Sequence, residues 1–343
     1  MTRVAAIDCG TNTIRLLIAE ADRDQSGRPR LEVLRRRNEI VRLGQGVDRT
    51  GMLDPEALER TLRVVAAYAA DCDELGVAPG EAVRRFVATS ATRDASNRED
   101  FVAGVRRLLG VEPEVVSGQE EARLSFSGSL LGARGAEGAE VQGRAGRVPA
   151  PRLVVDLGGG STELVLGMDE PRAAISLDTG SVRITERFLS SGVTVGAEAA
   201  ARAEVRGLLD DAERVVDLSA PGRLVGLAGT ITTVTAHALG LQDFDPQALN
   251  GAELSPDAVL ASCEAIIHST AEQRASWGYL APGRRDVIAA GALVWSEVVT
   301  RVVERTAAAG RPLERVTTSL YDILDGIALS LVPAQAGPEG DEV

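Results

Sequence analysis

The chain has 343 residues, of which 44% are hydrophobic and 25% are charged, and its formal net charge is −13. This length and apolar content favour two domains with sizeable cores, while the acidic balance disfavours generic nucleic-acid binding, which needs a basic surface. All 37 basic residues are arginine, which excludes Schiff-base chemistry on lysine and the lysine-bearing phosphate loop.

Cysteines and histidines are few and far apart. Cys9, Cys72 and Cys263 indicate reduced thiols rather than a disulfide framework or a zinc site. Two isolated histidines, His237 and His268, make a His-rich metal site or a Ser-His-Asp hydrolase a poor candidate. The N-terminus has no signal-peptide pattern, and no apolar run approaches the roughly 18 residues of a membrane span. We therefore expect a cytoplasmic protein without a membrane segment.

The first half of the chain predicts strands that alternate with helices. Asp54 is a candidate N-cap followed by Pro55 at the first helical position, and Gly76 closes that helix. A strand then leads into a turn rich in hydroxyls at residues 89–97. The expected strands are 4–7, 14–20, 31–43, 82–88 and 111–118, and the expected helices are 55–76, 98–110 and 119–133.

The second half begins after residues 134–151, a Gly-, Ala-, Glu- and Pro-containing stretch without periodicity that predicts an exposed, flexible connection. "LVVDLGGGSTELVLGM" at 153–168 predicts strand, tight turn and strand. The expected later elements are a strand and helix over 223–239, helices over 255–276 and 284–310, and a strand and helix over 315–332. Residues 334–343 are expected to form a disordered acidic tail.

One pattern occurs twice in the chain. "VAAIDCGTNTIRLLIAE" aligns with "RLVVDLGGGSTELVLGM", so that Asp8 matches Asp156 and Gly10 matches Gly158, 148 residues apart. Coincidence is an alternative for so short a pattern, but duplication is favoured because each copy opens a half with a similar order of elements. Alternating strands and helices predict an α/β fold, here with two related domains facing each other across a cleft.

Both repeated turns are candidate phosphate sites, because backbone N–H groups in a tight turn can converge on phosphate oxygens. The alternative is a simple hairpin turn, but three successive glycines are costly in backbone entropy, which favours close approach by a ligand. The candidate phosphate-binding residues are Thr11, Asn12 and Thr13 in one turn and Gly158, Gly159, Gly160, Ser161 and Thr162 in the other.

The carboxylates beside these turns are candidate metal ligands. Asp156 and Glu163 flank the Gly-rich turn, and Mg²⁺ prefers a few carboxylates together with phosphate oxygens and water. The alternatives are that Asp156 caps its turn and that Glu163 is a solvated strand residue. Asp8 is the equivalent acid in the first turn, with a direct or water-mediated metal contact.

Arg93 is the first choice for the cation that meets phosphate, because its planar guanidinium matches a pair of phosphate oxygens. Ser90 is a candidate partner in phosphate binding, and Arg183 is a second candidate cation. The alternative for Arg93 is an ion pair with Asp94 at a helix cap.

The chain resembles the exopolyphosphatase and guanosine pentaphosphate phosphatase (Ppx/GppA) family of the actin-like, sugar-kinase and Hsp70 ATPase superfamily. The stretches that carry the resemblance are "AAIDCGTNTIRLLI", "VATSATRDASN", "VVSGQEEARLSF", "LVVDLGGGSTELVLG", "LDTGSVRITERF", "VGLAGTITT", "RRDVIAAGALV" and "DILDGIA". Each alone is a weak to moderate signal, whereas all of them in order are strongly specific. The chain resembles a short, two-domain member without the C-terminal His-Asp type region of longer members.

The resemblance implies two duplicated actin-like (ribonuclease H-like) domains, at 1–127 and 128–333, with the active site between them. It assigns Glu121 the role of orienting or deprotonating water, whereas its neighbour Glu120 fits a favourable interaction with the helix dipole. Gly229 and Thr230 match a stretch that binds nucleotide in relatives with ATPase activity.

The function implied is release of orthophosphate from the end of inorganic polyphosphate of short chain length, with Mg²⁺, or alternatively Mn²⁺, as cofactor. The nearest alternative is hydrolysis of the terminal phosphate of guanosine pentaphosphate. A kinase or ATP-driven switch on the same fold and a non-catalytic alarmone or nucleotide sensor are alternatives of other classes. A homodimer is also implied; no nucleic-acid or membrane partner is expected.

Overall fold

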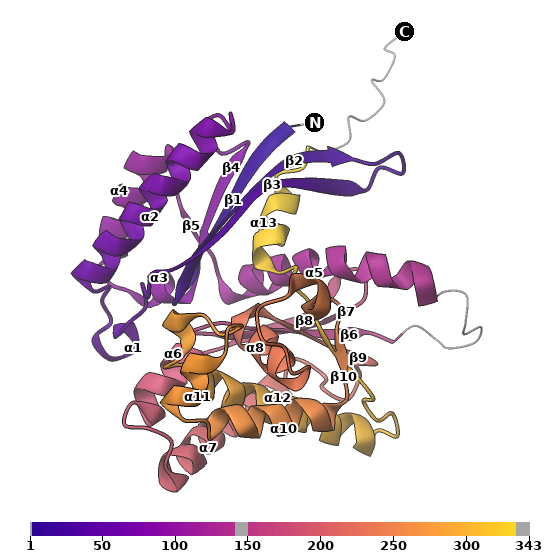
Figure 1. Cartoon of the computed structure of the whole chain (residues 1–343). Coiled ribbons are helices and arrows are strands. Elements are labelled where there is room, and N and C mark those ends of the chain that lie inside the picture. Colours follow the sequence, from indigo (N-terminus) through magenta and orange to yellow (C-terminus); the bar gives the residue numbers. More distant parts are fainter. Residues whose placement is uncertain (1, 141–149, 334–343) are drawn as a thin grey trace.

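The computed structural model describes residues 2–140 and 150–333. Two lobes lie one above the other, each built around one β-sheet (Figure 1). The strand order is β3-β2-β1-β4-β5 in the first sheet and β10-β11-β9-β6-β7-β8 in the second.

The first half of the chain forms β1 (Thr2–Cys9), β2 (Thr13–Arg23), β3 (Pro29–Ile40), α1 (Val47–Thr50), α2 (Pro55–Glu74), β4 (Arg84–Ala88), α3 (Ser90–Asp94), α4 (Arg98–Leu109), β5 (Glu114–Val115) and α5 (Gly118–Glu140). The second half forms β6 (Arg152–Leu157), β7 (Thr162–Gly167), β8 (Pro171–Leu177), α6 (Ser181–Ile184), a π-helical turn (Thr185–Leu189), α7 (Val195–Ala212), β9 (Arg223–Leu227), α8 (Ala228–Ala238), α9 (Pro246–Leu249), β10 (Glu253–Leu254), α10 (Pro256–Ile267), α11 (Ala271–Ser276), a 3₁₀ turn (Pro282–Arg284), α12 (Ile288–Ala308), β11 (Val316–Thr318) and α13 (Ile323–Ser330).

The predicted duplication is confirmed by the registers of the two sheets. In the first hairpin Asp8 pairs with Arg15, and in the second Asp156 pairs with Glu163, at the same 148-residue offset. The register shifts fall at the same offset too, between Ile18 and Ala19 and between Leu166 and Gly167. In each lobe the first strand also pairs in parallel with a later strand, β4 or β9.

The cores explain how the two sheets are held together. Alternate residues of β1 face opposite sides, so Ile7 packs under α2 and α4 while Ala6 packs against α13. Helix α5 lies between the lobes (Figure 1): its Leu124 joins the core under α13, and its Phe126 packs on Val154 and Val165 of the second sheet. The layer of α5 and α13 therefore fixes how the two sheets approach each other.

Local signals placed most helix starts correctly. The Asp54 side chain accepts a hydrogen bond from the Ala57 amide, and Ser255 caps α10 in the same way. The hydroxyl-rich turn after β4 differs, because residues 90–94 close into a short helix, α3. The helix predicted from Arg284 begins at Ile288, since the residues before it form i→i+3 turns of their own.

The structure differs in part from the predicted connection and from the predicted domain boundary. Helix α5 extends to Glu140, so the first part of the predicted 134–151 connection is helical. Residues 141–149 of that connection and the predicted tail at 334–343 lie outside the described residues. Helix α13 comes from the predicted 128–333 domain but packs on the first sheet. Across the described residues, no helix combines the length and apolar character needed to cross a bilayer.

Candidate active site

The two repeated turns face each other where the lobes meet. Each turn is closed by the same hydrogen bond, from Gly10 N to Thr13 O at 2.9 Å and from Gly158 N to Ser161 O at 3.0 Å. The Thr11 hydroxyl lies 2.8 Å from the Ser90 hydroxyl, which stands at the start of α3. Three predicted phosphate-binding stretches therefore lie close together. The turn at 11–13 and Ser90 come from the first lobe, and the turn at 158–160 comes from the second lobe.

Gly160 is required at this junction for a steric reason. A Cβ atom at position 160 would lie 2.6 Å from Thr11 Oγ1 and 2.8 Å from Ser90 Oγ. A Cβ at Gly159 would also crowd Thr11, at 3.2 Å from its Cβ. These glycines let the two turns come into contact across the junction of the lobes.

A cavity of about 120 Å³ opens beside this junction. Residues of both lobes line it, among them Thr11, Asn12, Arg42, Thr185 and Asp286. The hydroxyls of Ser161 and Thr162 point elsewhere: Ser161 supports Glu163, and Thr162 donates to Thr179 O at 2.8 Å. Gly229 and Thr230 lie in the first turn of α8 in the second lobe, and Thr230 is 7% exposed.

Two carboxylates at the end of the second hairpin are buried. Asp156 accepts a 2.6 Å hydrogen bond from Ser125 Oγ, and Glu163 accepts one of 2.7 Å from Ser176 Oγ. Burial raises the pKa of Asp156 to about 6, and the nearby Asp322 carboxylate adds to the effect. Burial also raises the pKa of Glu163, with further repulsion from Glu121 and Asp156. Burial and the neighbouring carboxylates therefore both disfavour the charged forms of Asp156 and Glu163.

Glu121 lies in the first turn of α5 and is 7% exposed. Its carboxylate accepts a 3.2 Å hydrogen bond from Arg93 Nη1, which also donates to Val116 O at 3.0 Å. Burial raises the pKa of Glu121 to about 8, against the opposing effect of Arg93. Asp94 pairs with Arg183 at 2.7 Å, so the expected alternative of an Arg93–Asp94 cap pair is not formed. Arg93 instead stands beside the predicted water-activating carboxylate.

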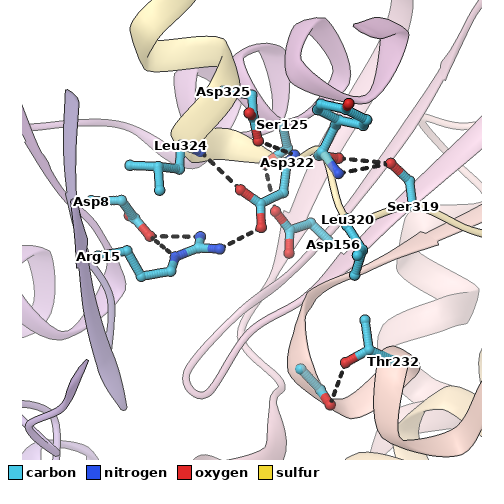
Figure 2. Close-up of polar contacts among 12 residues, drawn as sticks. Asp8, Arg15, Ser125, Asp156, Thr232, Ser319, Leu320, Asp322, Leu324 and Asp325 are labelled. Carbon is cyan, nitrogen blue, oxygen red and sulfur yellow. Dashed lines mark hydrogen bonds and ion pairs between the residues drawn. The ribbon is translucent and has the colours of Figure 1, made fainter. Parts of the chain in front are cut away.

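Sequence reasoning missed an ion-pair cluster in the first lobe. Figure 2 shows the Arg15 guanidinium between the carboxylates of Asp8 and Asp322, with Asp156 next to Asp322. Arg15 donates to Asp8 Oδ2 at 2.9 and 2.7 Å and also pairs with Asp322, the N-cap of α13. Neither residue has a role predicted from the sequence: Asp322 occurs only in the stretch "DILDGIA", and Arg15 only in the strand that follows the first turn.

A second missed cation is Arg284. A Cβ at Gly229 would lie 2.3 Å from Arg284 Cζ, so the guanidinium rests against the start of α8. Burial lowers the pKa of Arg284, and repulsion from Arg15 contributes. Within residues 2–140 and 150–333, no carboxylate stands within ion-pairing distance of this guanidinium. The side chain is therefore a partly buried positive charge without a carboxylate partner among these residues.

The buried carboxylates fit a divalent cation of the Mg²⁺ type. A cation beside Asp156, Glu163 and Glu121 would relieve the mutual repulsion that raises their pKa values. Their ligand atoms do not form a closed three-carboxylate cage: in the described part of the chain, the one group of three within 4.8 Å is Glu198, Glu264 and His268. Mg²⁺ commonly uses one or two carboxylates, with water and phosphate oxygens completing the shell.

The group of Glu198, Glu264 and His268 lies away from this junction, on α7 and the end of α10. Arg202 donates to Glu198 at 2.9 Å and to Glu264 at 2.6 Å. This guanidinium already compensates the two carboxylates, which accounts for the cluster without a metal ion.

Fold and site together define a class: a duplicated, actin-like α/β protein whose two phosphate-type turns meet in a cleft above buried carboxylates. Residues 18–309 match the Ppx/GppA phosphatase family, and the chain belongs to that family. This confirms the resemblance and the fold class inferred from the sequence.

Individual relatives agree over nearly the whole chain. Exopolyphosphatase 2 of Mycobacterium tuberculosis is 44% identical over 337 residues, covering 96% of this chain and 99% of the relative. A crystal structure of an exopolyphosphatase-like protein is 40% identical, covers 96% and 97% of the two chains and has a TM-score of 0.84. The Aquifex aeolicus PPX-GPPA enzyme is 28% identical, with coverage of 96% and 99% and a TM-score of 0.72.

Proposed function

We propose that this chain is an exopolyphosphatase, a phosphoanhydride hydrolase that releases orthophosphate from the end of short inorganic polyphosphate chains with Mg²⁺ as cofactor. The family and the 44% identity to an exopolyphosphatase over 337 residues support the reaction class. The structural observation that carries the proposal is the contact of two equivalent phosphate-type turns above three buried carboxylates of raised pKa.

The turns would bind the terminal phosphates. The turns at Thr11–Thr13 and Gly158–Gly160 approach from opposite lobes, so a phosphate bound beside their contact would meet backbone N–H groups of both turns. The Gly158 N–H is excluded from this role, because it already donates to Ser161 O. Two arginines of the protein would offset part of the negative charge of the bound phosphate. These are Arg93, which lies beside Glu121, and Arg284, which lies beside Gly229. Mg²⁺ near Asp156 and Glu163, with Asp8 as a further ligand directly or through water, would supply the remaining positive charge.

Glu121 would orient the attacking water and accept its proton. Burial raises the pKa of Glu121 in the metal-free protein, and a cation beside it would lower that pKa and favour the charged form, which is the form that accepts a proton. Arg93 holds the carboxylate in one orientation through its 3.2 Å hydrogen bond. The attack would be in line with the leaving phosphate chain, so catalysis depends on positioning and charge stabilisation.

The base assignment is tested by a pair of variants at adjacent positions. Glu121→Gln keeps the side-chain volume but removes the proton acceptor, so we expect phosphate release to fall about 10²- to 10⁴-fold. Glu120→Gln is the matched control: its side chain is 41% exposed, and the nearest cation, Arg85, is 3.8 Å away. Equal rates for the two variants would show that Glu121 does not act on water.

The substrate is tested with one panel of phosphoanhydrides. Phosphate release from polyphosphates of defined length and from guanosine pentaphosphate, each with Mg²⁺ or Mn²⁺, separates the proposed activity from its nearest alternative. We expect the highest kcat/KM with short polyphosphate. A preference for guanosine pentaphosphate would assign the chain to the other activity in the family's name. Binding without turnover of any anhydride would favour a sensor.

Two further parts of the proposal rest on the family resemblance: a cytoplasmic location and a homodimer. Sedimentation equilibrium of the purified chain measures the second of these directly.

A further inference from the structure

The two lobes are also joined by ion pairs on the side of the cleft away from α5 and α13 (Figure 1). Asp48, in α1 of the first lobe, accepts hydrogen bonds from Arg187 Nε at 2.6 Å and Arg187 Nη2 at 2.7 Å. The same carboxylate pairs with Arg183 of α6. Nearby, Gly46 N donates to Glu186 at 2.9 Å, and Arg42 pairs with Asp286 at 2.8 Å.

The segment that carries Asp48 is attached to the phosphate-type turn of its own lobe. Gly44 N donates to Thr11 O at 2.8 Å, and Arg42 N donates to Asn12 O at 2.9 Å. The fit is tight, because a Cβ at Gly44 would lie 2.4 Å from Thr11 Cγ2. A displacement of Asp48 is therefore transmitted to Thr11 and Asn12 through short, direct contacts.

The partner of Asp48 is attached to the other turn. Arg183 Nε donates to Gly160 O at 2.8 Å, while its remaining nitrogens meet Asp48 and Asp94. Arg183 is only 11% exposed and Asp48 18% exposed, so solvent screens this pair less than an exposed surface pair. The Asp48–Arg183 pair thus links the residues that support the two turns, from opposite lobes.

We propose that Asp48 is a positioning residue that holds the lobes closed through Arg183 and Arg187 and so sets the separation of the two phosphate-binding turns. Asp48 does not touch the reacting atoms; it acts through the turns. The proposal rests on the proposed phosphohydrolase function for its kinetic consequence, but the closed arrangement itself can be measured without substrate.

Removal of the pair has a specific kinetic signature. If the binding-competent closed state is less populated, the apparent dissociation constant rises in inverse proportion to that population. Once substrate is bound, both turns grip it and the closed state is restored. Loss of Asp48 therefore raises KM and leaves kcat nearly unchanged, whereas a partly unfolded variant would lose kcat at unchanged KM.

The experiment compares Asp48→Asn, Asp48→Glu and Arg187→Gln with wild type, using phosphate release from short polyphosphate with Mg²⁺. We expect KM to rise on the order of tenfold for Asp48→Asn, less for Arg187→Gln, and to return toward wild type in Asp48→Glu, which keeps the carboxylate. Glu213→Gln is the matched control, because Glu213 pairs with Arg301 and Arg305 inside the second lobe, and its KM should not change.

A second readout needs no activity. Small-angle scattering of the substrate-free chain should give a larger radius of gyration for Asp48→Asn than for wild type or Glu213→Gln. The proposal is overturned if Asp48→Asn keeps the wild-type KM, if its KM falls, or if Asp48→Glu fails to recover it while folding normally by circular dichroism. Wild-type protein that releases no phosphate from any anhydride would refute the proposed function, and the scattering comparison would then decide on Asp48 independently.

Discussion

The two hairpins have equivalent backbone registers, but the residue paired with the aspartate is basic in one hairpin and acidic in the other. In the first lobe, the residue opposite Asp8 is Arg15, and the pair is closed by hydrogen bonds of 2.9 and 2.7 Å. In the second lobe, the residue opposite Asp156 is Glu163, so two buried carboxylates stand where the first lobe has an ion pair.

This difference assigns distinct tasks to two copies of one motif. The first hairpin carries its own counter-ion, which also reaches Asp322 and ties α13 to the sheet. Burial raises the pKa of Asp8 too, but Arg15 opposes that shift. The second hairpin has an acid in place of this arginine, and burial together with nearby carboxylates raises the pKa values of Asp156 and Glu163. A duplicated turn therefore predicts shared geometry, and the exchange of Arg15 for Glu163 is the reason why the proposed Mg²⁺ is assigned to the second lobe.

The largest effect is expected from removing the counter-ion of the first hairpin. Arg15→Gln leaves the buried carboxylates of Asp8 and Asp322 without their cation, so we expect a loss of about 3–5 kcal/mol in the free energy of unfolding. Urea denaturation measures it. Arg63→Gln is the control, because the side chains of the Arg63–Glu59 pair are 66% and 73% exposed and the pair should contribute about 0.5 kcal/mol or less. Similar losses for both would contradict a structural role of Arg15.

The next effect concerns the metal. Asp156→Asn and Glu163→Gln each remove a proposed Mg²⁺ ligand, and we expect losses of phosphate release on the order of 10²- to 10³-fold, partly restored by higher Mg²⁺. Asp8→Asn should shift the Mg²⁺ dependence less, because Arg15 already compensates Asp8. An equal shift for Asp8→Asn would place Asp8 in the metal's ligand shell alongside the other two.

A third effect is the pH dependence of the free energy of unfolding, measured on protein from which divalent metal ions have been removed with a chelator. The folded-state pKa of Asp156 is about 6, above the ordinary value of 3.8 for an aspartate, so the folded chain binds this proton more tightly than the unfolded chain. Stability from Asp156 is therefore lost as pH rises from about 4 to 6, by up to about 3 kcal/mol. Urea denaturation of wild type and Asp156→Asn across this range isolates the contribution; identical pH slopes would refute it.

The smallest effect tests the contact between the turns. Gly160→Ala places a Cβ 2.6 Å from Thr11 Oγ1, and we expect about 1–3 kcal/mol of destabilisation together with weaker substrate binding. Gly10→Ala, in the other hairpin, meets its nearest atom, Thr13 O, at 3.5 Å and should be tolerated better. Thermal unfolding and KM values for the two variants test this difference.

Periodicity and capping residues predicted most of the fold, because helix and strand signals are local. The Asp54 and Ser255 caps and the repeated hairpin were all readable within about twenty residues of sequence. The packing of α13 on the first sheet was not readable, because it depends on contacts between residues some 300 positions apart, such as Arg15 with Asp322.

Some residues of the candidate site were likewise predictable from the sequence, and others were not. Glu121, Asp156, Glu163 and the two turns were identified from motifs, and the structure brings them to one junction. Arg284 and Asp322 were missed, because an arginine before a helix and an aspartate at a helix cap carry no local sign of function. Their proximity to the cleft arises only from the folded arrangement of the C-terminal elements.

The sequence by itself determined the α/β class, the duplication at a 148-residue offset and the acids beside each turn, since these depend on spacing along the chain. The tertiary structure alone decided which acids are compensated. Charge balance depends on distance through space, and it is the packing of α13 and the apposition of the lobes that place Arg15 on Asp8 and leave Asp156 and Glu163 without an ion-pair partner among residues 2–140 and 150–333.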